Sequence, residues 1–411
     1  MDESPLLVGI DVGTTKVCAL IADADEAGQL RILGVGLEPS QGMRKGVVVD
    51  VEQAGRSIAL AVDKAQRSAG YEIGAAFVSL AGAHVSSVNS RGVVGIGGGS
   101  HGIEQDDIDR ALDSAQAIAI PHGREVLHVI PRGFIVDGQE GIRQPLGMHG
   151  FRLEVEAHII TAATASVQNL TKCVEAAGVQ VEAYVLNPLA SAEVTLTDTE
   201  KEMGVVVVDI GGGTTDLAIY IDGNVWHTQV LAVGGNHLTS DIAHGLRLPA
   251  DLAEKVKLEH GSASAGDVPM HETFLVQPFG EDHPLQVTRY DLATIIEARV
   301  EEIFGLILQE IKRTGYDGLL PAGVVLTGGS SQMPGLRKVA SGVLNLPCRV
   351  AGPQNLNGLV DKLTGPAFST SVGLLHWAAR ESALPSARKT KKKSRTLDLG
   401  RGIDFFKRLL P

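Results

Sequence analysis

Residues Val205 to Ile221 read VVVVDIGGGTTDLAIYI, and they are the most informative stretch for the fold of this chain. An apolar run is followed by an aspartate, three glycines and two threonines, and a second apolar run follows these. The pattern is typical of a buried strand, a tight turn and a second strand. Residues Leu6 to Ala22, LLVGIDVGTTKVCALIA, show the same pattern much earlier in the chain. A single glycine-rich hairpin is usually only a turn, but two related copies indicate a duplicated pair of lobes.

The two hairpins carry the groups that bind phosphate. Glycine lets backbone N–H groups approach phosphate oxygens closely, and threonine hydroxyls add further donors. An aspartate at the end of each strand can hold a hydrated Mg²⁺ ion, and we expect Asp11 and Asp209 to do so through water. The predicted binding residues of the hairpins are Asp11, Gly13, Thr14, Thr15, Lys16, Asp209, Gly211, Gly212, Gly213, Thr214 and Thr215.

A third apolar strand ends in glycines near residue 328. Val324 to Leu336 read VVLTGGSSQMPGL, in which the strand runs into Gly328, Gly329 and Ser330. A backbone without side chains can approach a flat ring or a ribose at this point. We therefore add these three residues to the predicted ligand site.

The last ten residues, GIDFFKRLLP from Gly402 to Pro411, form an amphipathic pattern. At 100° per residue, the apolar side chains gather on one face of a helix and the charged ones on the other. Residues from Ser386 to the end include nine Lys or Arg and two Asp, giving a charge of +7; the whole chain carries −12, so the preceding body carries −19. The expected membrane-contacting residues are Ile403, Phe405, Phe406, Lys407, Arg408, Leu409 and Leu410.

This tail has the layout of a peripheral membrane anchor. An anionic lipid surface attracts each basic residue by roughly 1 kcal/mol and repels an acidic body. The alternative is that the apolar face packs on the chain's own core. We favour the membrane, because a docking helix rarely needs a polar tether of about 17 residues, and a basic flank has no use in a core.

The rest of the sequence excludes several other classes. There is no apolar run of about 18 residues and no basic N-terminal region, so we expect neither a transmembrane span nor a signal peptide. The three cysteines are widely spaced, which is typical of reduced thiols. Only the short tail has a net basic charge, and it lacks a recognisable nucleic-acid fold or aromatic stacking pattern, so we expect no nucleic-acid partner.

The order of these motifs resembles the actin-like ATPase superfamily, in which five motifs line a cleft between two lobes. The matching segments are Gly9 to Lys16, Val185 to Ala192, Val206 to Asp216, Leu326 to Ser331 and Gly365 to Leu374. The resemblance implies an α/β fold of two lobes, with ATP and Mg²⁺ bound between them.

The segment AEKVK, from Ala253 to Lys257, is similar to the helix that faces the ribose and adenine in this superfamily. The resemblance implies that Glu254 and Lys257 contact the nucleotide. The other interpretation is an exposed pair three residues apart on a helix, and the sequence leaves both open.

Within the superfamily, the chain resembles the FtsA family of bacterial division proteins from Leu7 to Leu410. Three features carry this: the segment His84 to Thr161, the stretch GNHLTSDIA at Gly235 to Ala243, and the amphipathic C-terminus after a tether. The resemblance implies an ATP-binding, self-associating protein on the cytoplasmic side of the inner membrane at the division site. It would anchor FtsZ filaments by binding the FtsZ C-terminal peptide, and recruit later division proteins. The alternatives are a PilM-like pilus scaffold and an actin-fold ATPase or phosphotransferase.

The expected organisation follows from these motifs. We place residues 1–83, 162–192 and 363–382 in the first lobe, with an inserted small subdomain at 84–161. The second lobe spans 193–362, with 228–304 as its outer part. A basic flexible tether at 383–401 leads to the amphipathic membrane-targeting helix at 402–411.

One residue departs from the superfamily pattern. Related chaperones and MreB-like proteins begin the first connecting segment with Glu-Pro, which places a carboxylate near the attacking water, whereas this chain has Asn187-Pro188. An asparagine cannot accept the proton, and loss of a general base typically slows a reaction by about 10²- to 10⁴-fold. We therefore expect nucleotide binding with weak or absent hydrolysis, and assign no catalytic residue.

Overall fold

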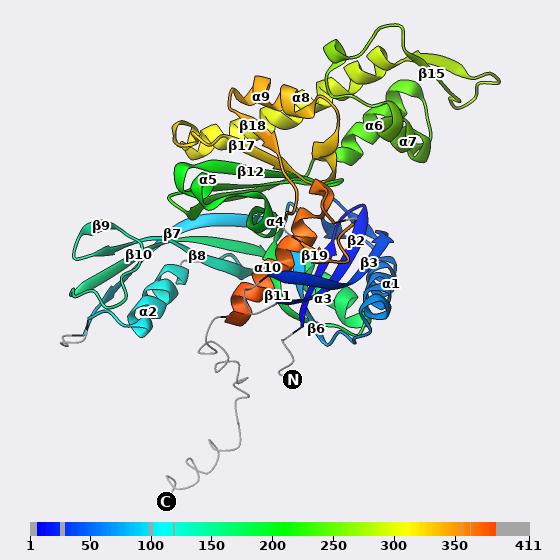
Figure 1. Cartoon of the computed structure of the whole chain (residues 1–411). Coiled ribbons are helices and arrows are strands. Elements are labelled where there is room, and N and C mark those ends of the chain that lie inside the picture. Colours follow the sequence, from blue (N-terminus) through cyan, green and yellow to red (C-terminus); the bar gives the residue numbers. More distant parts are fainter. Residues whose placement is uncertain are drawn as a thin grey trace, which may run out of the picture.

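The computed structural model describes residues 6–24, 29–97, 102–117, 120–354, 356–361 and 363–383. The predicted amphipathic helix at 402–411, and the predicted tether except Ala383, lie outside these residues. Figure 1 shows an elongated molecule, with the elements of the first lobe on the right, those of the second lobe above and an inserted subdomain on the left.

The first lobe is built on a six-stranded sheet whose centre is the first predicted hairpin. In spatial order the strands are β11 (Gln180–Leu186), β6 (Ala75–Leu80), β1 (Leu7–Val12), β2 (Lys16–Ala24), β3 (Leu30–Pro39) and β19 (Asn357–Gly358). The central strand β1 pairs antiparallel with β2 and parallel with β6. Every residue of β1 is buried, as expected of a strand covered on both faces.

The second lobe repeats this arrangement around the second hairpin. Its strands are β14 (Asn224–Leu231), β13 (Thr215–Ile221), β12 (Val205–Ile210), β17 (Val324–Thr327) and β18 (Cys348–Val350). The buried central strand β12 again has an antiparallel neighbour, β13, on one side and a parallel neighbour, β17, on the other. The two sheets therefore share one strand order and one set of directions, as the two sequence copies predicted.

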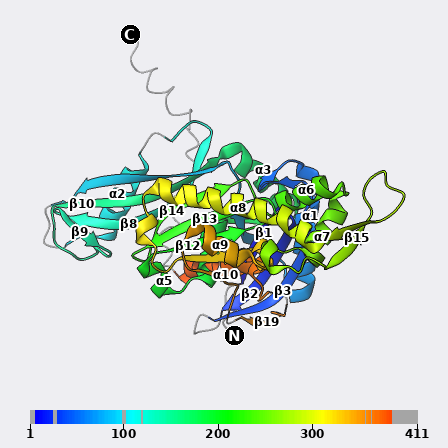
Figure 2. The same cartoon turned by 90° about the horizontal axis from the view of Figure 1, so that it is seen from above.

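Helices cover both sheets. Those of the first lobe are α1 (Val51–Ala69), α3 (Thr164–Ala176), α4 (Asn187–Thr195) and α10 (Ser369–Ala383), and those of the second are α5 (Asp198–Met203), α6 (Gly235–Leu246), α7 (Ala250–His260), α8 (Arg289–Thr314) and α9 (Leu336–Leu344). The hairpin β15 (Thr273–Val276) and β16 (Leu285–Thr288) lies beyond α7. In Figure 2, α8 runs along the length of the second lobe and buries its apolar stripe against the core.

The remaining short elements are loops with brief pairing or a single helical turn. They are β4 (Met43–Arg44), β5 (Val47–Val48), and the 3₁₀ turns η1 (Ala265–Asp267), η2 (Asp317–Leu319), η3 (Gly329–Gln332) and η4 (Pro366–Phe368). Of these, η3 and η4 contribute to the cavity between the lobes.

The inserted subdomain is a separate four-stranded sheet with one helix. Its strands, in spatial order, are β7 (Val85–Gly95), β10 (Arg152–Ala163), β8 (Arg124–Val136) and β9 (Gln139–Ile142), and α2 (Gln105–Gln116) packs on them. It rests on the second lobe: the Arg143 guanidinium binds both carboxylate oxygens of Glu202 at 2.7 and 2.8 Å, and the Ser87 hydroxyl donates to the Thr228 carbonyl at 2.9 Å.

One expected boundary differs from the structure. The sequence places residues up to 362 in the second lobe, but Asn357 and Gly358 pair with Arg31 and Ile32 of β3. The chain therefore returns to the first lobe a few residues early. A two-residue strand has no periodicity to reveal it, since its position depends on an exposed sheet edge formed elsewhere in the chain.

Candidate functional site

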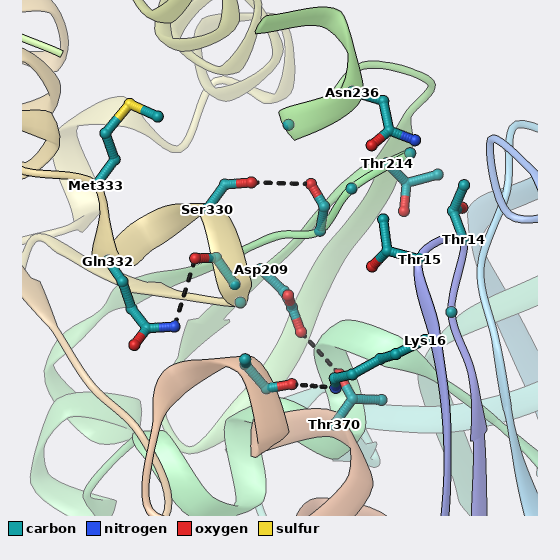
Figure 3. Close-up of a pocket in the computed structure, with 18 of the residues that line it drawn as sticks. Thr14, Thr15, Lys16, Asp209, Thr214, Asn236, Ser330, Gln332, Met333 and Thr370 are labelled. Atoms are coloured by element: carbon teal, nitrogen blue, oxygen red, sulfur yellow. Dashed lines mark hydrogen bonds between the residues drawn. The ribbon is translucent and has the colours of Figure 1, made fainter. Parts of the chain in front are cut away.

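A cavity of about 510 Å³ lies between the lobes. The two predicted hairpins, α7, η3 and the N-termini of α6 and α10 form its wall. It contains all predicted ligand-binding residues except Thr215. In Figure 3, Thr14, Thr15 and Lys16 lie on one side, Ser330, Gln332 and Met333 on the other, and Asp209 between them.

The two hairpin turns approach each other so closely that glycine is required. A Cβ atom on Gly212 would lie 2.3 Å from the Thr15 methyl, and one on Gly213 would lie 2.3 Å from the Thr14 hydroxyl oxygen. Contacts this short do not occur between real atoms, so any other residue would push the turns apart. The glycines thus allow the backbone amides of both lobes to border one cavity.

Two carboxylates at the strand ends are fixed by hydroxyl groups. Asp11 accepts hydrogen bonds from the Ser79 hydroxyl at 2.9 Å and the Ser371 hydroxyl at 2.7 Å, and the Lys16 ammonium lies 3.9 Å from it. Asp209 accepts one from the Thr370 hydroxyl at 2.8 Å, which Figure 3 shows as a dashed line. Both side chains are thus oriented before any ligand arrives.

Burial destabilises the charged form of two carboxylates at the cavity. It raises the pKa of Asp209 to about 6, and the nearby Asp11 charge adds to this effect. Burial and the Asp209 charge together raise the pKa of Asp216 well above its usual range. Both groups line the cavity, so a bound cation there would favour their ionised forms.

Two buried oxygens at this cavity have no hydrogen-bond partner. They are Oδ1 of Asp216 and Oδ1 of Asn187. A buried polar atom without a partner is costly, and a bound group that brings donors removes that cost. The water shell of Mg²⁺ supplies such donors, so the residues fit a hydrated ion. Within the described ranges, no group of three or more His, Cys, Asp or Glu is arranged to hold a metal directly.

The far end of the cavity contains Glu254 and Lys257 of α7. The Lys257 ammonium donates to the Thr239 hydroxyl at 2.9 Å and the Gly235 carbonyl at 3.2 Å, and it pairs with Glu254 at 2.7 Å. Lys257 is buried, so the two residues are not simply an exposed pair on a solvated helix. Both side chains line the cavity beside Gly328, Gly329 and Ser330.

Thr215 differs from its neighbours in position. Its buried hydroxyl donates to the Val233 carbonyl at 2.8 Å, and the residue does not line the cavity. Side chains alternate between the two faces of a strand, so Thr214 and Asp216 face the cavity while Thr215 points the other way. Thr215 therefore fixes the hairpin to the following loop instead of facing a ligand.

The sequence interpretation missed several lining residues. They include Asp216, Asn236, Gln332, Met333 and Thr370. Thr370 belongs to a run of three hydroxyl residues at the start of α10: Ser369 bonds to Thr327 at 2.7 Å, Thr370 to Asp209 and Ser371 to Asp11. The run Ser369-Thr370-Ser371 in the second connecting segment was the available signal. It links strand ends of both lobes to one helix.

No described helix has the length and apolarity that a membrane span needs. The residues predicted to contact a membrane all lie after residue 383, outside the described part of the chain.

Comparison with known families identifies two matching models. The model "Cell division protein FtsA" matches residues 206–373, and the model "SHS2 domain inserted in FTSA" matches residues 82–161. The chain is 43% identical over 378 residues to cell division protein FtsA of Pseudomonas aeruginosa, covering 92% of this chain and 90% of that protein. It is 38% identical over 395 residues to FtsA of Escherichia coli K12, covering 94% of this chain and 93% of that protein.

Solved structures with lower sequence identity to this chain share its fold. The PilM–PilN type IV pilus biogenesis complex aligns with a TM-score of 0.66 at 15% identity, covering 91% of this chain and 98% of that one. MreB5 of Spiroplasma citri bound to ADP aligns with a TM-score of 0.54 at 14% identity, covering 93% of this chain and 97% of that one. The MamK double helical filament aligns with a TM-score of 0.52 at 14% identity, covering 92% of this chain and 99% of that one. The predicted actin-like fold with an inserted subdomain is confirmed.

Proposed function

The chain belongs to the FtsA family of actin-like cell division proteins, and from this premise we propose that it is a nucleotide-binding, self-associating adaptor that holds FtsZ filaments at the inner membrane. It would bind the C-terminal peptide of FtsZ and recruit later division proteins, working at the division site on the cytoplasmic face. A PilM-like pilus role has weaker support, because the PilM–PilN likeness is one of fold at 15% identity.

The observation that carries nucleotide binding is the cavity between the two glycine turns. Asp11 and Asp209 would hold Mg²⁺ through water, and the ion would neutralise phosphate charge. Thr14, Thr15, Lys16 and Thr214 would bind the phosphates. The other predicted residues of the turns, Gly13, Gly211, Gly212 and Gly213, would offer backbone amides to the same groups.

The opposite end of the cavity suits the nucleoside. Gly328, Gly329 and Ser330 present a backbone and a small side chain, and the pair Glu254 and Lys257 offers an acceptor and donors for ribose hydroxyls. A relative with the same fold, MreB5, is described as bound to ADP. These features support ATP as the ligand of this chain.

We expect slow hydrolysis at this site. Asn187 begins α4 and borders the cavity with an unpartnered side-chain oxygen. This amide can accept a hydrogen bond from a water molecule and orient it, but cannot take its proton. The ATP-bound form would then persist long enough to act as an assembly state.

Calorimetry with Asp209→Asn tests the nucleotide site. The change keeps the shape of the side chain and its capacity to accept the Thr370 bond, but removes the charge facing Mg²⁺. Affinity for ATP with Mg²⁺ should fall at least about tenfold, which corresponds to about 1.4 kcal/mol. Asp282→Asn, at an exposed position of the second lobe, is the control and should bind as wild type. Equal affinity of Asp209→Asn and wild type would remove this assignment.

Vesicle sedimentation tests the membrane anchor. Phe406→Glu places a charge within the apolar face of the C-terminal segment and should release the protein from vesicles containing phosphatidylglycerol, while Phe151→Glu, at an exposed position of the inserted subdomain, should not. Deleting Lys391 to Lys393 should weaken binding mainly to anionic lipid and mainly at low salt. Undiminished sedimentation of Phe406→Glu would contradict the anchor.

A further inference from the structure

A second cavity, of about 740 Å³, lies away from the nucleotide site, between the inserted subdomain and the first lobe. Strand β8 borders it with residues 127–131, and strand β11 borders it with residues 182–184. Helices α4 and α10, the turn between β13 and β14, and single residues of β6, α2 and α5 complete the wall. None of the nucleotide-site residues reaches this cavity.

Both strands border the cavity at an edge that no further described strand covers, and one hydrogen bond, from the Leu186 N–H of β11 to His128 Nε2 of β8 at 3.2 Å, bridges them. β11 is the outermost strand of the first-lobe sheet and, among the described residues, pairs only with β6. In the inserted sheet, β8 pairs with β10 on one side, while β9 on its other side pairs only with Phe134 and Val136. Residues 127–131 therefore have no strand beyond them. Strand edges that no further strand covers, beside a cavity with both polar and apolar walls, are a common place for a peptide segment to bind.

The wall combines apolar and acidic side chains. Leu127, Ile130 and Trp377 are only partly buried and leave apolar surface in the cavity. The two cations of the wall, Arg380 and Lys201, both pair with Glu193, at 2.7 and 4.0 Å. Glu182 and Glu381 are exposed and have no ion pair within the described part of the chain. A segment that carries both apolar and basic side chains would complement this wall.

The chain itself carries such a segment, and it begins close by. Helix α10 contributes Trp377, Arg380 and Glu381 to the cavity and ends at Ala383, so the rest of the chain starts at the cavity's border. Nineteen residues, 384–402, then lead to residues 403–410, IDFFKRLL. A random coil of 19 residues would span roughly 25 Å on average, which is long enough for residues 403–410 to reach back to the cavity.

We propose that this second cavity binds the chain's own C-terminal segment, residues 403–410, and withholds it from the membrane. The apolar side chains would enter between β8 and β11, and Lys407 and Arg408 would lie near Glu182 and Glu381. The proposed function does not include this docking site. Its consequence for membrane binding, however, rests on the membrane anchor of the proposed function. Docking and membrane binding use the same apolar side chains and therefore compete.

The effect of docking on the apparent affinity for vesicles can be estimated. A short flexible link gives the tethered segment an effective concentration in the millimolar range. If the segment docks with a dissociation constant of about 0.1 mM, roughly ten molecules are docked for each free one, and apparent vesicle affinity falls about tenfold. Occupation of the cavity by another ligand, or membrane clustering of several tails, would release it.

Photo-crosslinking of the full chain tests docking without lipid. A benzophenone amino acid replaces Phe406, and mass spectrometry locates the crosslinks in a mixture of isotopically light and heavy protein. Crosslinks within one molecule to residues 127–131, 182–184 or 377–381 are expected. Crosslinks only between molecules, only elsewhere, or none would overturn the proposal.

A matched pair of double variants tests the consequence. Glu182→Lys with Glu381→Lys reverses the unpaired charges of the cavity, while Glu140→Lys with Glu301→Lys adds the same charge at exposed positions elsewhere. The first pair should lose the crosslink and bind phosphatidylcholine–phosphatidylglycerol vesicles several-fold more tightly than the second. Equal crosslinking and equal vesicle affinity of the two pairs would refute docking. Crosslinking that follows this pattern while Phe406→Glu still sediments would instead refute the membrane anchor alone.

Discussion

Asp209→Asn should stabilise the nucleotide-free protein while weakening its ligand binding. Asp209 is buried beside Asp11, and burial raises its pKa from 3.8 to about 6. Each pKa unit corresponds to roughly 1.4 kcal/mol, so ionisation of this carboxyl destabilises the folded state by about 3 kcal/mol at neutral pH. The asparagine keeps the shape and the Thr370 bond but carries no charge.

The pH dependence has a definite sign. Since the folded protein holds the proton of Asp209 more tightly than the unfolded chain, this group's stabilising effect is complete below about pH 4 and is lost as pH rises through about 6. Asp209→Asn has no titrating carboxyl at this position, so its stability does not have this pH dependence. Asp209→Asn should therefore match wild type near pH 4 and be more stable by up to about 3 kcal/mol at pH 7.5.

Thermal melting in the presence of a chelator measures this difference. At roughly 2.1 cal/mol/K of unfolding entropy per residue, 3 kcal/mol corresponds to a rise of about 3–4 °C for a chain of 411 residues. Adding ATP with Mg²⁺ should raise the midpoint of wild type more than that of the variant, because only wild type binds the ligand tightly. The control Asp282→Asn should follow wild type at each pH.

One result would refute this reasoning. If Asp209→Asn melts below wild type by the same margin from pH 4 to 7.5, the carboxyl contributes through packing or hydrogen bonds and not through its charge. The proposed link between the cavity's electrostatics and a bound cation would then lose its basis.

Two further predictions concern the same cavity. Asn187→Glu should raise the rate of ATP hydrolysis in single-turnover assays by about 10²-fold or more, because it restores a proton acceptor; a rate independent of residue 187 would exclude this explanation of slow turnover. Thr370→Val removes the hydroxyl that bonds Asp209, so it should weaken Mg-ATP binding several-fold in calorimetry and lower stability by roughly 1–3 kcal/mol. Unchanged affinity would show that this bond does not position the carboxylate.

The duplicated core was predictable because its signal is local. Each hairpin carries strand, glycine turn and threonines within about 17 residues, and the structure places both at the centres of equivalent sheets. The pairing of β19 with β3 was not predictable, since residues far apart in the sequence create it. The sequence did not separate Thr215, which does not line the cavity, from Thr214, which does, because a repeated Thr-Thr does not show which hydroxyl faces the cavity, whereas strand alternation does.

The missed residues share a different cause. Asn236 and Thr370 enter the cavity from the first turns of α6 and α10, which lie far along the chain from the hairpins they face. Such positions depend on how two lobes close on each other, and no short sequence pattern contains that information. The pair Glu254 and Lys257 was left open for the same reason, since only the packing of α7 decides whether Lys257 is buried.

Helix α10 gives the two proposed sites a physical connection. Its first residues bond to strand ends of both lobes, through Ser369 to Thr327, Thr370 to Asp209 and Ser371 to Asp11. Farther along the helix, Trp377 and Glu381, about 12 and 18 Å from Ser369 at 1.5 Å per residue, line the second cavity. If a change in lobe closure shifts Thr370, we infer that α10, moving as a rigid body, would also shift Trp377 against β8 and β11. Nucleotide state and tail release would then be coupled by this one helix, and Thr370→Val should change the crosslinking of residue 406 as well as nucleotide affinity.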